Sequence, residues 1–118
     1  MLLKTVAGIR VRSKSEALIT MLLYTNKIPF RYECALTLGE TTVYPDFTIR
    51  HPETKKTFYW EHFGLMDQPY YAQNTYSKLK LYTDHGIYPS IHLLTTYETQ
   101  DHPLDSLLVE NLIQTYFL

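Results

Sequence analysis

Two acidic residues stand inside strand-like stretches of apolar and aromatic residues in this 118-residue chain. Asp46 lies in "TVYPDFTIR" and Glu61 in "TFYWEHFG", and the polar segment "HPETKK" joins the two stretches. Asp and Glu are depleted from β-strands, so each of these acids needs a compensating partner. A symmetric hairpin closed by residues 51–56 would place Asp46 directly opposite Glu61 on one face of a sheet, where like charges destabilise each other.

A divalent cation is one way to stabilise two opposed carboxylates. At about 4 Å their repulsion is roughly 1 kcal/mol in bulk water and about 4 kcal/mol at an effective dielectric constant of 20. Mg²⁺ and Mn²⁺ prefer hard oxygen ligands and therefore suit such a pair. The residues alone leave two alternatives open. Both acids could lie on a solvated face, or the register could slip by one residue and move one acid to the opposite face.

Periodicity predicts the elements that must position these acids. Ser13 and Glu16 fit a capping box at the start of the first helix, and Leu107 and Leu108 belong to the apolar pattern of the last one. The predicted elements, in chain order, are a helix over 13–26, strands over 30–38, 43–50 and 57–64, a helix over about 69–85, a strand over 88–96 and a helix over about 104–116.

This order of elements predicts an α/β fold with a central mixed sheet flanked by helices. Three consecutive strands can form an antiparallel meander. The fourth strand follows a helix, so a crossover can place it parallel to its neighbour. The chain length fits one domain over residues 1–118.

A third acid extends the pattern to a known family. Glu16 on the first helix, Pro45-Asp46 on the second strand and Glu61 in "WEHFG" on the third strand resemble the PD-(D/E)XK nuclease superfamily. From about residue 13 to 116 the element order is similar to that superfamily's αβββαβ core with one added helix. The resemblance implies a restriction-endonuclease-like fold and a nuclease, endo- or exonucleolytic, that hydrolyses phosphodiester bonds by a metal-activated water. The products would end in 5′-phosphate and 3′-hydroxyl groups.

The resemblance also gives each matching residue a role. Asp46 and Glu61 would bind Mg²⁺ or Mn²⁺, and Glu16 would be a further ligand or a water-positioning acid. The main-chain carbonyl of His62 would complete the metal shell. We expect the His62 imidazole to be structural, because period-two alternation points it away from Glu61. Considered alone, Glu16 is better explained as the capping partner of Ser13.

The family lysine, two residues after the second acid, is replaced here by Phe63. Some relatives carry that lysine on the following helix, where this chain has Lys78 and Lys80. We prefer Lys78, because helical spacing puts it on one side of the predicted helix with three other polar side chains, Tyr71, Asn74 and Tyr82. It would orient or deprotonate the attacking water, or neutralise charge on the phosphate. Lys80 remains a candidate contact for nucleic acid, and a solvated lysine is the alternative for both.

The charge of the chain limits its partners. A net charge of −1, from 11 basic and 12 acidic residues, gives no overall signature of a polyanion-binding protein. One basic cluster, Arg10, Arg12 and Lys14, would contact backbone phosphates, although a solvated surface also explains it. The expected partner is nucleic acid, with DNA favoured over RNA. Because no second domain is present to read bases, specificity would require a homodimer or a larger nucleic-acid-processing assembly.

Cysteine content and hydropathy bear on the compartment. The single cysteine, Cys34, excludes an internal disulfide and a cysteine-based zinc site, and we expect it in the core of a cytoplasmic protein. No segment reaches the roughly 18 consecutive apolar residues of a membrane span, so we expect no membrane partner.

Two other functions remain open. Phe63 favours a catalytically inactive nuclease-fold module that binds nucleic acid or a protein. The 11 tyrosines are compatible with a small protein-interaction domain.

Overall fold

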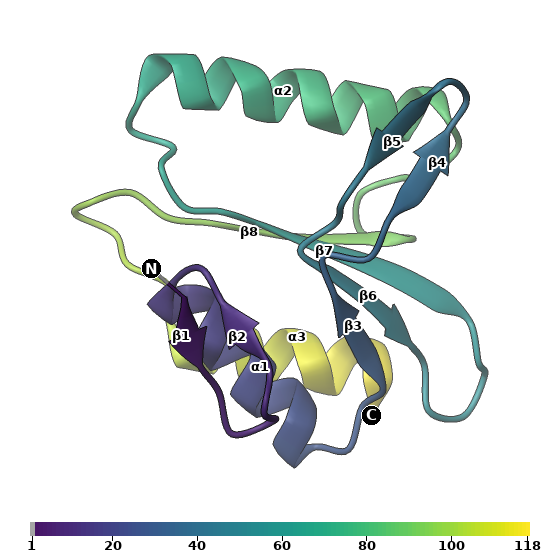
Figure 1. Ribbon diagram of the computed structural model, residues 1–118, viewed down its shortest axis with the longest axis vertical. Helices are drawn as coiled ribbons and strands as arrows, with labels where there is room; N and C mark the ends of the chain where they lie inside the picture. The colour runs from purple at the N-terminus through teal and green to yellow at the C-terminus, as the bar shows by residue number, and fades with distance from the viewer. Residues whose placement is uncertain (1) are drawn as a thin grey trace.

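The computed structural model describes residues 2–118 as a four-stranded sheet with helices on both faces (Figure 1). The strands of this sheet, in spatial order, are β3 (Phe30–Tyr32), β6 (Phe47–Arg50), β7 (Thr57–Phe63) and β8 (Leu93–Tyr97). The first three pair antiparallel, and β8 pairs parallel to β7. The predicted α/β fold with a mixed central sheet is therefore confirmed.

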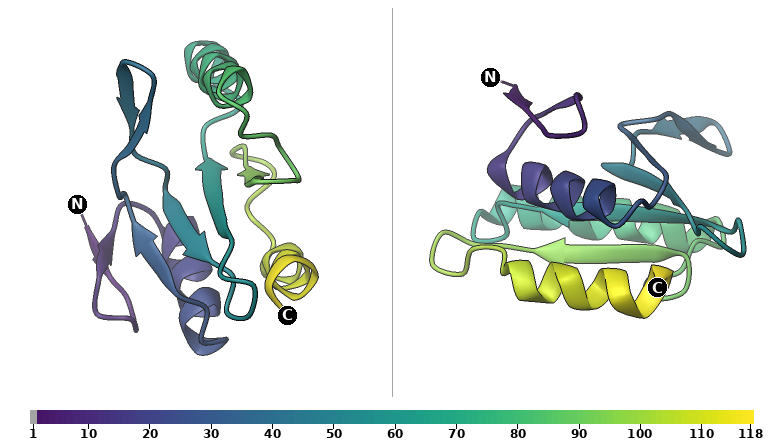
Figure 2. Two further views of the ribbon diagram at one scale, coloured as in Figure 1. Left: turned by 90° about the vertical axis from the view of Figure 1, so that its right-hand side faces the viewer. Right: turned by 90° about the horizontal axis from the view of Figure 1, so that it is seen from below.

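Three helices cover the two faces of the sheet. They are α1 (Lys14–Thr25), α2 (Pro69–Asp84) and α3 (Ser106–Phe117). Helices α1 and α3 lie on one face and α2 lies on the other (Figures 1 and 2). The hydroxyl of Ser13 accepts the N–H of Glu16 at 3.1 Å, which confirms the predicted start of the first helix. Within residues 2–118, none of the helices has the length and apolar character needed to cross a membrane.

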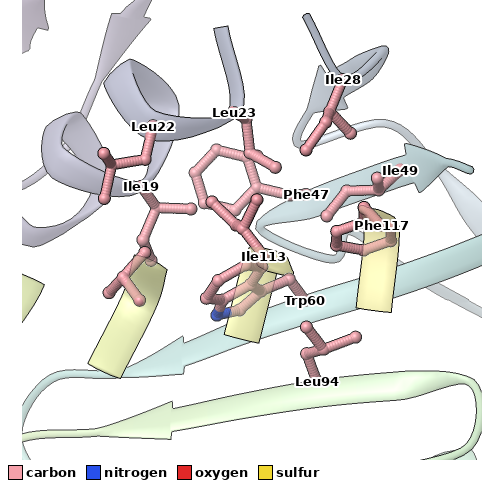
Figure 3. Packing of buried hydrophobic residues seen from close by; sticks show 11 residues of the cluster. Ile19, Leu22, Leu23, Ile28, Phe47, Ile49, Trp60, Leu94, Ile113 and Phe117 are labelled. Carbon is pink, nitrogen blue, oxygen red and sulfur yellow. The ribbon is translucent and has the colours of Figure 1, made fainter. Parts of the chain in front are cut away.

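The larger hydrophobic core lies between the sheet and helices α1 and α3 (Figure 3). Trp60 of β7 is fully buried at its centre, and its indole N–H donates to the hydroxyl of Thr96 at 3.1 Å. The buried members of this core are Ile19, Leu22, Leu23, Ile28, Phe47, Ile49, Trp60, Leu94, Val109, Ile113 and Phe117. This core occupies the face of β6 and β7 opposite to Asp46 and Glu61, as period-two alternation requires.

The buried stripe of α3 differs from the predicted one. Val109, Ile113 and Phe117 face the core, whereas Leu107 is 59% exposed and Leu108 is 46% exposed. Residues spaced by four lie on one face of a helix, so Val109 and the residues four and eight positions after it form the buried face. The two leucines before Val109 lie outside that face. The prediction that Leu107 and Leu108 belong to the packed stripe is wrong.

The predicted strands over 30–38 and 43–50 are each interrupted. Their outer parts form a separate ribbon, β4 (Leu36–Leu38) and β5 (Thr41–Val43), which tips towards α2 (Figure 1). Glu33 adopts a left-handed conformation with φ of 51° at one break. Pro45 lies at the other break, where it has no N–H for a ladder hydrogen bond.

Because the ribbon of β4 and β5 bends towards α2, its apolar side chains pack on the α2 side of the sheet. Leu38 packs with Tyr82 and Leu93 in a second, smaller cluster on the α2 side, and Val43 joins its edge. Strict alternation along residues 43–50 would place Val43 on the same face as Phe47, but the bend at Pro45 puts the two residues in different clusters. A short ribbon of β1 (Leu3–Lys4) and β2 (Arg10–Val11), which the sequence pattern did not predict, lies beside α1.

The α3 assignment can be tested by paired substitutions. We expect Ile113→Ala to lower the free energy of unfolding by about 2–5 kcal/mol, because it leaves a cavity in the core. Leu107→Ala should change it by about 0.5 kcal/mol or less, because its side chain is exposed. Urea unfolding followed by circular dichroism measures both, and equal losses would contradict this arrangement of the helix.

Candidate functional site

The hairpin register brings Asp46 and Glu61 together. Thr48 pairs with Tyr59 and Phe47 pairs with Trp60, so Asp46 comes opposite Glu61 at the next step. Both acids line one pocket of about 220 Å³ between the sheet and α2. Glu61 is only 1% exposed. The predicted pairing on one face is confirmed, and both a register slip and a fully solvated pair are wrong.

Helix α2 places two hydrogen-bonding groups on Glu61. The ammonium Nζ of Lys78 lies 2.7 Å from Glu61 Oε2, and the hydroxyl of Tyr82 donates to the same oxygen at 2.6 Å. These residues are four apart, so they share one face of the helix. Tyr71, Asn74 and Lys78 line the same pocket, as their predicted helical spacing requires.

The two candidate lysines differ clearly in position. The ammonium of Lys80 is exposed and pairs with Asp84 at 3.0 Å on the outer side of α2. Lys78 is therefore the lysine next to the acids. Sequence reasoning did not assign Tyr82 to the site, although its i+4 spacing from Lys78 was the available signal.

Asp46 is held by the main chain of β7. Its Oδ2 accepts the N–H of His62 at 2.7 Å. If the ladder continued, Pro45 would face His62, and Pro45 has no N–H to donate. The N–H and the carbonyl of one residue in a β-strand point to the same side, so the carbonyl of His62 also points towards β6 and Asp46. No N–H of the β6 strand lies opposite this carbonyl, because Pro45 occupies that position.

The surroundings of Asp46 disfavour its ionised form. Burial raises the pKa of Asp46 most, and the charge of Glu61 raises it further. The N–H of His62 and the charge of Lys78 act in the opposite direction but do not cancel these effects, and the pKa rises to about 8. Lys78 carries one positive charge against two carboxylates, so the metal-free pair retains a proton at neutral pH.

The oxygens of the pocket suit a hard cation. Among residues 2–118, no hydrogen bond is made to Asp46 Oδ1 or Glu61 Oε1. With the carbonyl of His62 they would offer three oxygen ligands of the kind that Mg²⁺ and Mn²⁺ prefer. In the described part of the chain no three His, Cys, Asp or Glu side chains gather into a metal cluster. A cation would therefore depend on two carboxylates and a main-chain carbonyl.

Glu16 has partners of its own. Its Oε1 accepts the N–H of Arg12 at 3.0 Å and the hydroxyl of Tyr32 at 3.0 Å. The structure does not bring its carboxylate together with those of Asp46 and Glu61. Its charge does contribute to raising the pKa of Asp46. The side chain reaches back to the N–H of Arg12, one position before the N-cap residue Ser13, so within residues 2–118 the reciprocal bond of the predicted capping box is not formed.

The imidazole of His62 lies on the opposite side of the sheet from Glu61, as predicted. Its Nδ1 is 2.8 Å from the hydroxyl of Thr96, and its Nε2 is 2.7 Å from Glu98 Oε1. Burial raises the pKa of Glu98, but hydrogen bonds from Ser15 and from His62 outweigh it, so the pKa is lowered overall. This network joins β7 to α1 and holds the main chain of His62 in place.

The predicted nucleic-acid contacts are exposed. Arg10, Arg12 and Lys14 all lie at the surface, and Arg12 Nε pairs with Glu33 Oε1 at 3.0 Å. Their role in binding stays a prediction.

Cys34, which was predicted to be a core residue, is only half-buried.

Comparisons with protein-family models, with curated proteins and with solved structures found no match to this chain.

The raised pKa of Asp46 predicts how stability depends on pH. Between its ordinary value of about 3.9 and its value of about 8 in the fold, the folded carboxyl keeps a proton that the unfolded chain has released. The free energy of unfolding of the metal-free protein should therefore fall as pH rises through this window. Urea unfolding in EDTA at pH 5 and pH 8 measures this effect.

The matched variant for this test is Asp46→Asn, which keeps the acceptor for His62 but cannot ionise. We expect it to lose less stability than the native chain between the two pH values. Equal losses would show that Asp46 ionises in the fold as it does in water.

Proposed function

We propose that this protein is a metal-dependent nuclease with a restriction-endonuclease-like core, and that it hydrolyses phosphodiester bonds of DNA. The observation that carries the proposal is the pairing of Asp46 with Glu61 in one pocket beside Lys78. Two carboxylates opposed in one pocket are costly, and groups with a raised pKa, such as Asp46, concentrate at functional sites. The resemblance of Glu16, Pro45-Asp46 and Glu61 to the PD-(D/E)XK pattern gives the same reaction class.

Asp46, Glu61 and the carbonyl of His62 would hold Mg²⁺ or Mn²⁺. When bound, such a cation polarises phosphate oxygens and offsets the negative charge that develops during in-line displacement. Tyr82 keeps Glu61 oriented through its 2.6 Å hydrogen bond. The N–H of His62 does the same for Asp46 at 2.7 Å. Glu16 acts from outside this set, because its oxygen is already bonded to Arg12 and Tyr32.

Lys78 supplies the mobile positive charge. Its side chain is one-third exposed, and its ammonium is 2.7 Å from Glu61, so it can turn from the carboxylate towards a substrate. There it donates hydrogen bonds to the attacking water or to a phosphate oxygen. Water adds to phosphorus, the bond to the 3′ oxygen breaks, and a proton from the water ends on the new 3′-hydroxyl group.

A catalytically inactive module is the second candidate, and one observation favours it. The ion pair between Lys78 and Glu61 already fastens α2 to the sheet without a metal. On this reading the acids are structural and the protein binds nucleic acid or a protein partner. The two candidates differ in whether Mn²⁺ binds and whether phosphodiester bonds are cleaved.

The test is a Mn²⁺-dependent cleavage assay on single-stranded DNA, duplex DNA and RNA. We expect cleavage by the native chain, and a loss of about 10²–10⁴-fold in rate for Asp46→Asn and for Lys78→Met. Asp84→Asn and Lys4→Met make the same chemical changes at exposed positions and should cleave at the native rate.

Thermal unfolding of each variant separates loss of chemistry from loss of fold. Cleavage that persists in EDTA, or that survives Asp46→Asn, would contradict the proposed reaction. Absence of cleavage together with absence of Mn²⁺ binding by calorimetry would favour the inactive module.

A further inference from the structure

Two arginines lie on the same face of the sheet as the acid pair, away from the pocket. Arg31 of β3 pairs with Thr48, and Arg50 at the end of β6 pairs with Thr57. In antiparallel strands, paired residues and every second residue along a strand share a face. These four side chains line a groove of about 390 Å³.

The two guanidinium groups have no acidic partner. Arg31 and Arg50 are exposed, and within residues 2–118 no carboxylate lies within 4.0 Å of either one. They are diagonal neighbours on adjacent strands, so their Cα atoms are about 7–8 Å apart. Two arginine side chains attached at this spacing can both reach one anion. Arg12 differs, because Glu33 already neutralises it.

The groove also offers neutral donors. The hydroxyls of Thr48 and Thr57 line it, and within residues 2–118 neither makes a hydrogen bond. Guanidinium groups bind phosphate through paired N–H donors, and threonine hydroxyls add single hydrogen bonds. We propose that this groove, Arg31, Thr48, Arg50 and Thr57, binds a phosphate of a nucleic-acid backbone. The identity of the ligand as nucleic acid rests on the proposed function.

The groove and the acid pocket can contact one strand. Arg50, the last residue of β6, is four residues after Asp46, which directly precedes the strand. Four residues of extended chain correspond to about 14 Å at about 3.4 Å per residue. Along the hairpin, the pair Thr48–Tyr59 comes between Asp46–Glu61 and Arg50–Thr57. Among the described residues the two hollows have no lining residue in common, so the groove is a separate contact point. At a rise of about 3.4 Å per nucleotide, the bound phosphate is about four nucleotides from the cleaved bond.

Binding measured in EDTA tests this inference without cleavage. The probes are a fluorescein-labelled single-stranded DNA of 12 nucleotides and its duplex, followed by fluorescence anisotropy over a series of salt concentrations. We expect the double variant Arg31→Gln/Arg50→Gln to bind about tenfold more weakly or worse at low salt. The slope of log affinity against log salt should shrink by about 0.7 to 0.9 for each lost phosphate contact.

Two further variants sharpen the result. Arg50→Lys keeps the charge but loses the paired donors, so its affinity should fall between those of the native chain and Arg50→Gln. Lys4→Gln removes one exposed charge from β1 and should bind as the native chain does. Circular dichroism verifies the fold of each variant.

The inference is overturned if the double variant keeps native affinity and salt slope, or if the native chain binds neither probe at low salt. It is also separable from the proposed function. Arginine-dependent binding without Mn²⁺-dependent cleavage would uphold the groove and contradict the nuclease. Cleavage with an unchanged KM in the double variant would uphold the nuclease and contradict the groove.

Discussion

The opposition of two carboxylates, the half-buried Asp46 and the buried Glu61, governs the arrangement of this structure. The pairing of β6 with β7 fixes them on one face, because each step along the hairpin alternates sides. Pro45 has no N–H and ends the ladder of hydrogen bonds next to Asp46. The N–H of His62 therefore donates to the carboxylate of Asp46, and the carbonyl of His62 has no ladder donor opposite it. One proline thus creates both the support of Asp46 and a third oxygen beside the pair.

The two faces of the sheet divide the tasks of stability and chemistry. Helices α1 and α3 cover a face of aromatic and aliphatic side chains, with Trp60 and Phe47 fully buried. The other face is polar near α2, where Lys78 and Tyr82 approach Glu61, and basic where Arg31 and Arg50 line a groove. A sheet packed tightly on one side can hold mutually repelling groups on the other, because the core fixes their backbone.

The sequence predicted most of the fold and half of the site, for identifiable reasons. Alternation and hairpin symmetry were sufficient to pair Asp46 with Glu61, and helical spacing was sufficient to choose Lys78 over Lys80. The breaks at Glu33 and Pro45 were not predicted, because a left-handed residue and a bent ribbon leave the alternating pattern intact. The hydrogen bonds of Glu16 and the groove arginines depend on how distant elements pack, which periodicity does not encode.

The most direct test of metal binding between Asp46 and Glu61 is anomalous diffraction from crystals soaked in Mn²⁺, recorded at the manganese absorption edge. We expect a peak in contact with the carboxylates of Asp46 and Glu61 and the carbonyl of His62, with Lys78 turned away from Glu61. A pocket without a peak, in which the Lys78 ammonium stays on Glu61 Oε2, would contradict this expectation. In that case a lysine, and not a metal, balances the two acids.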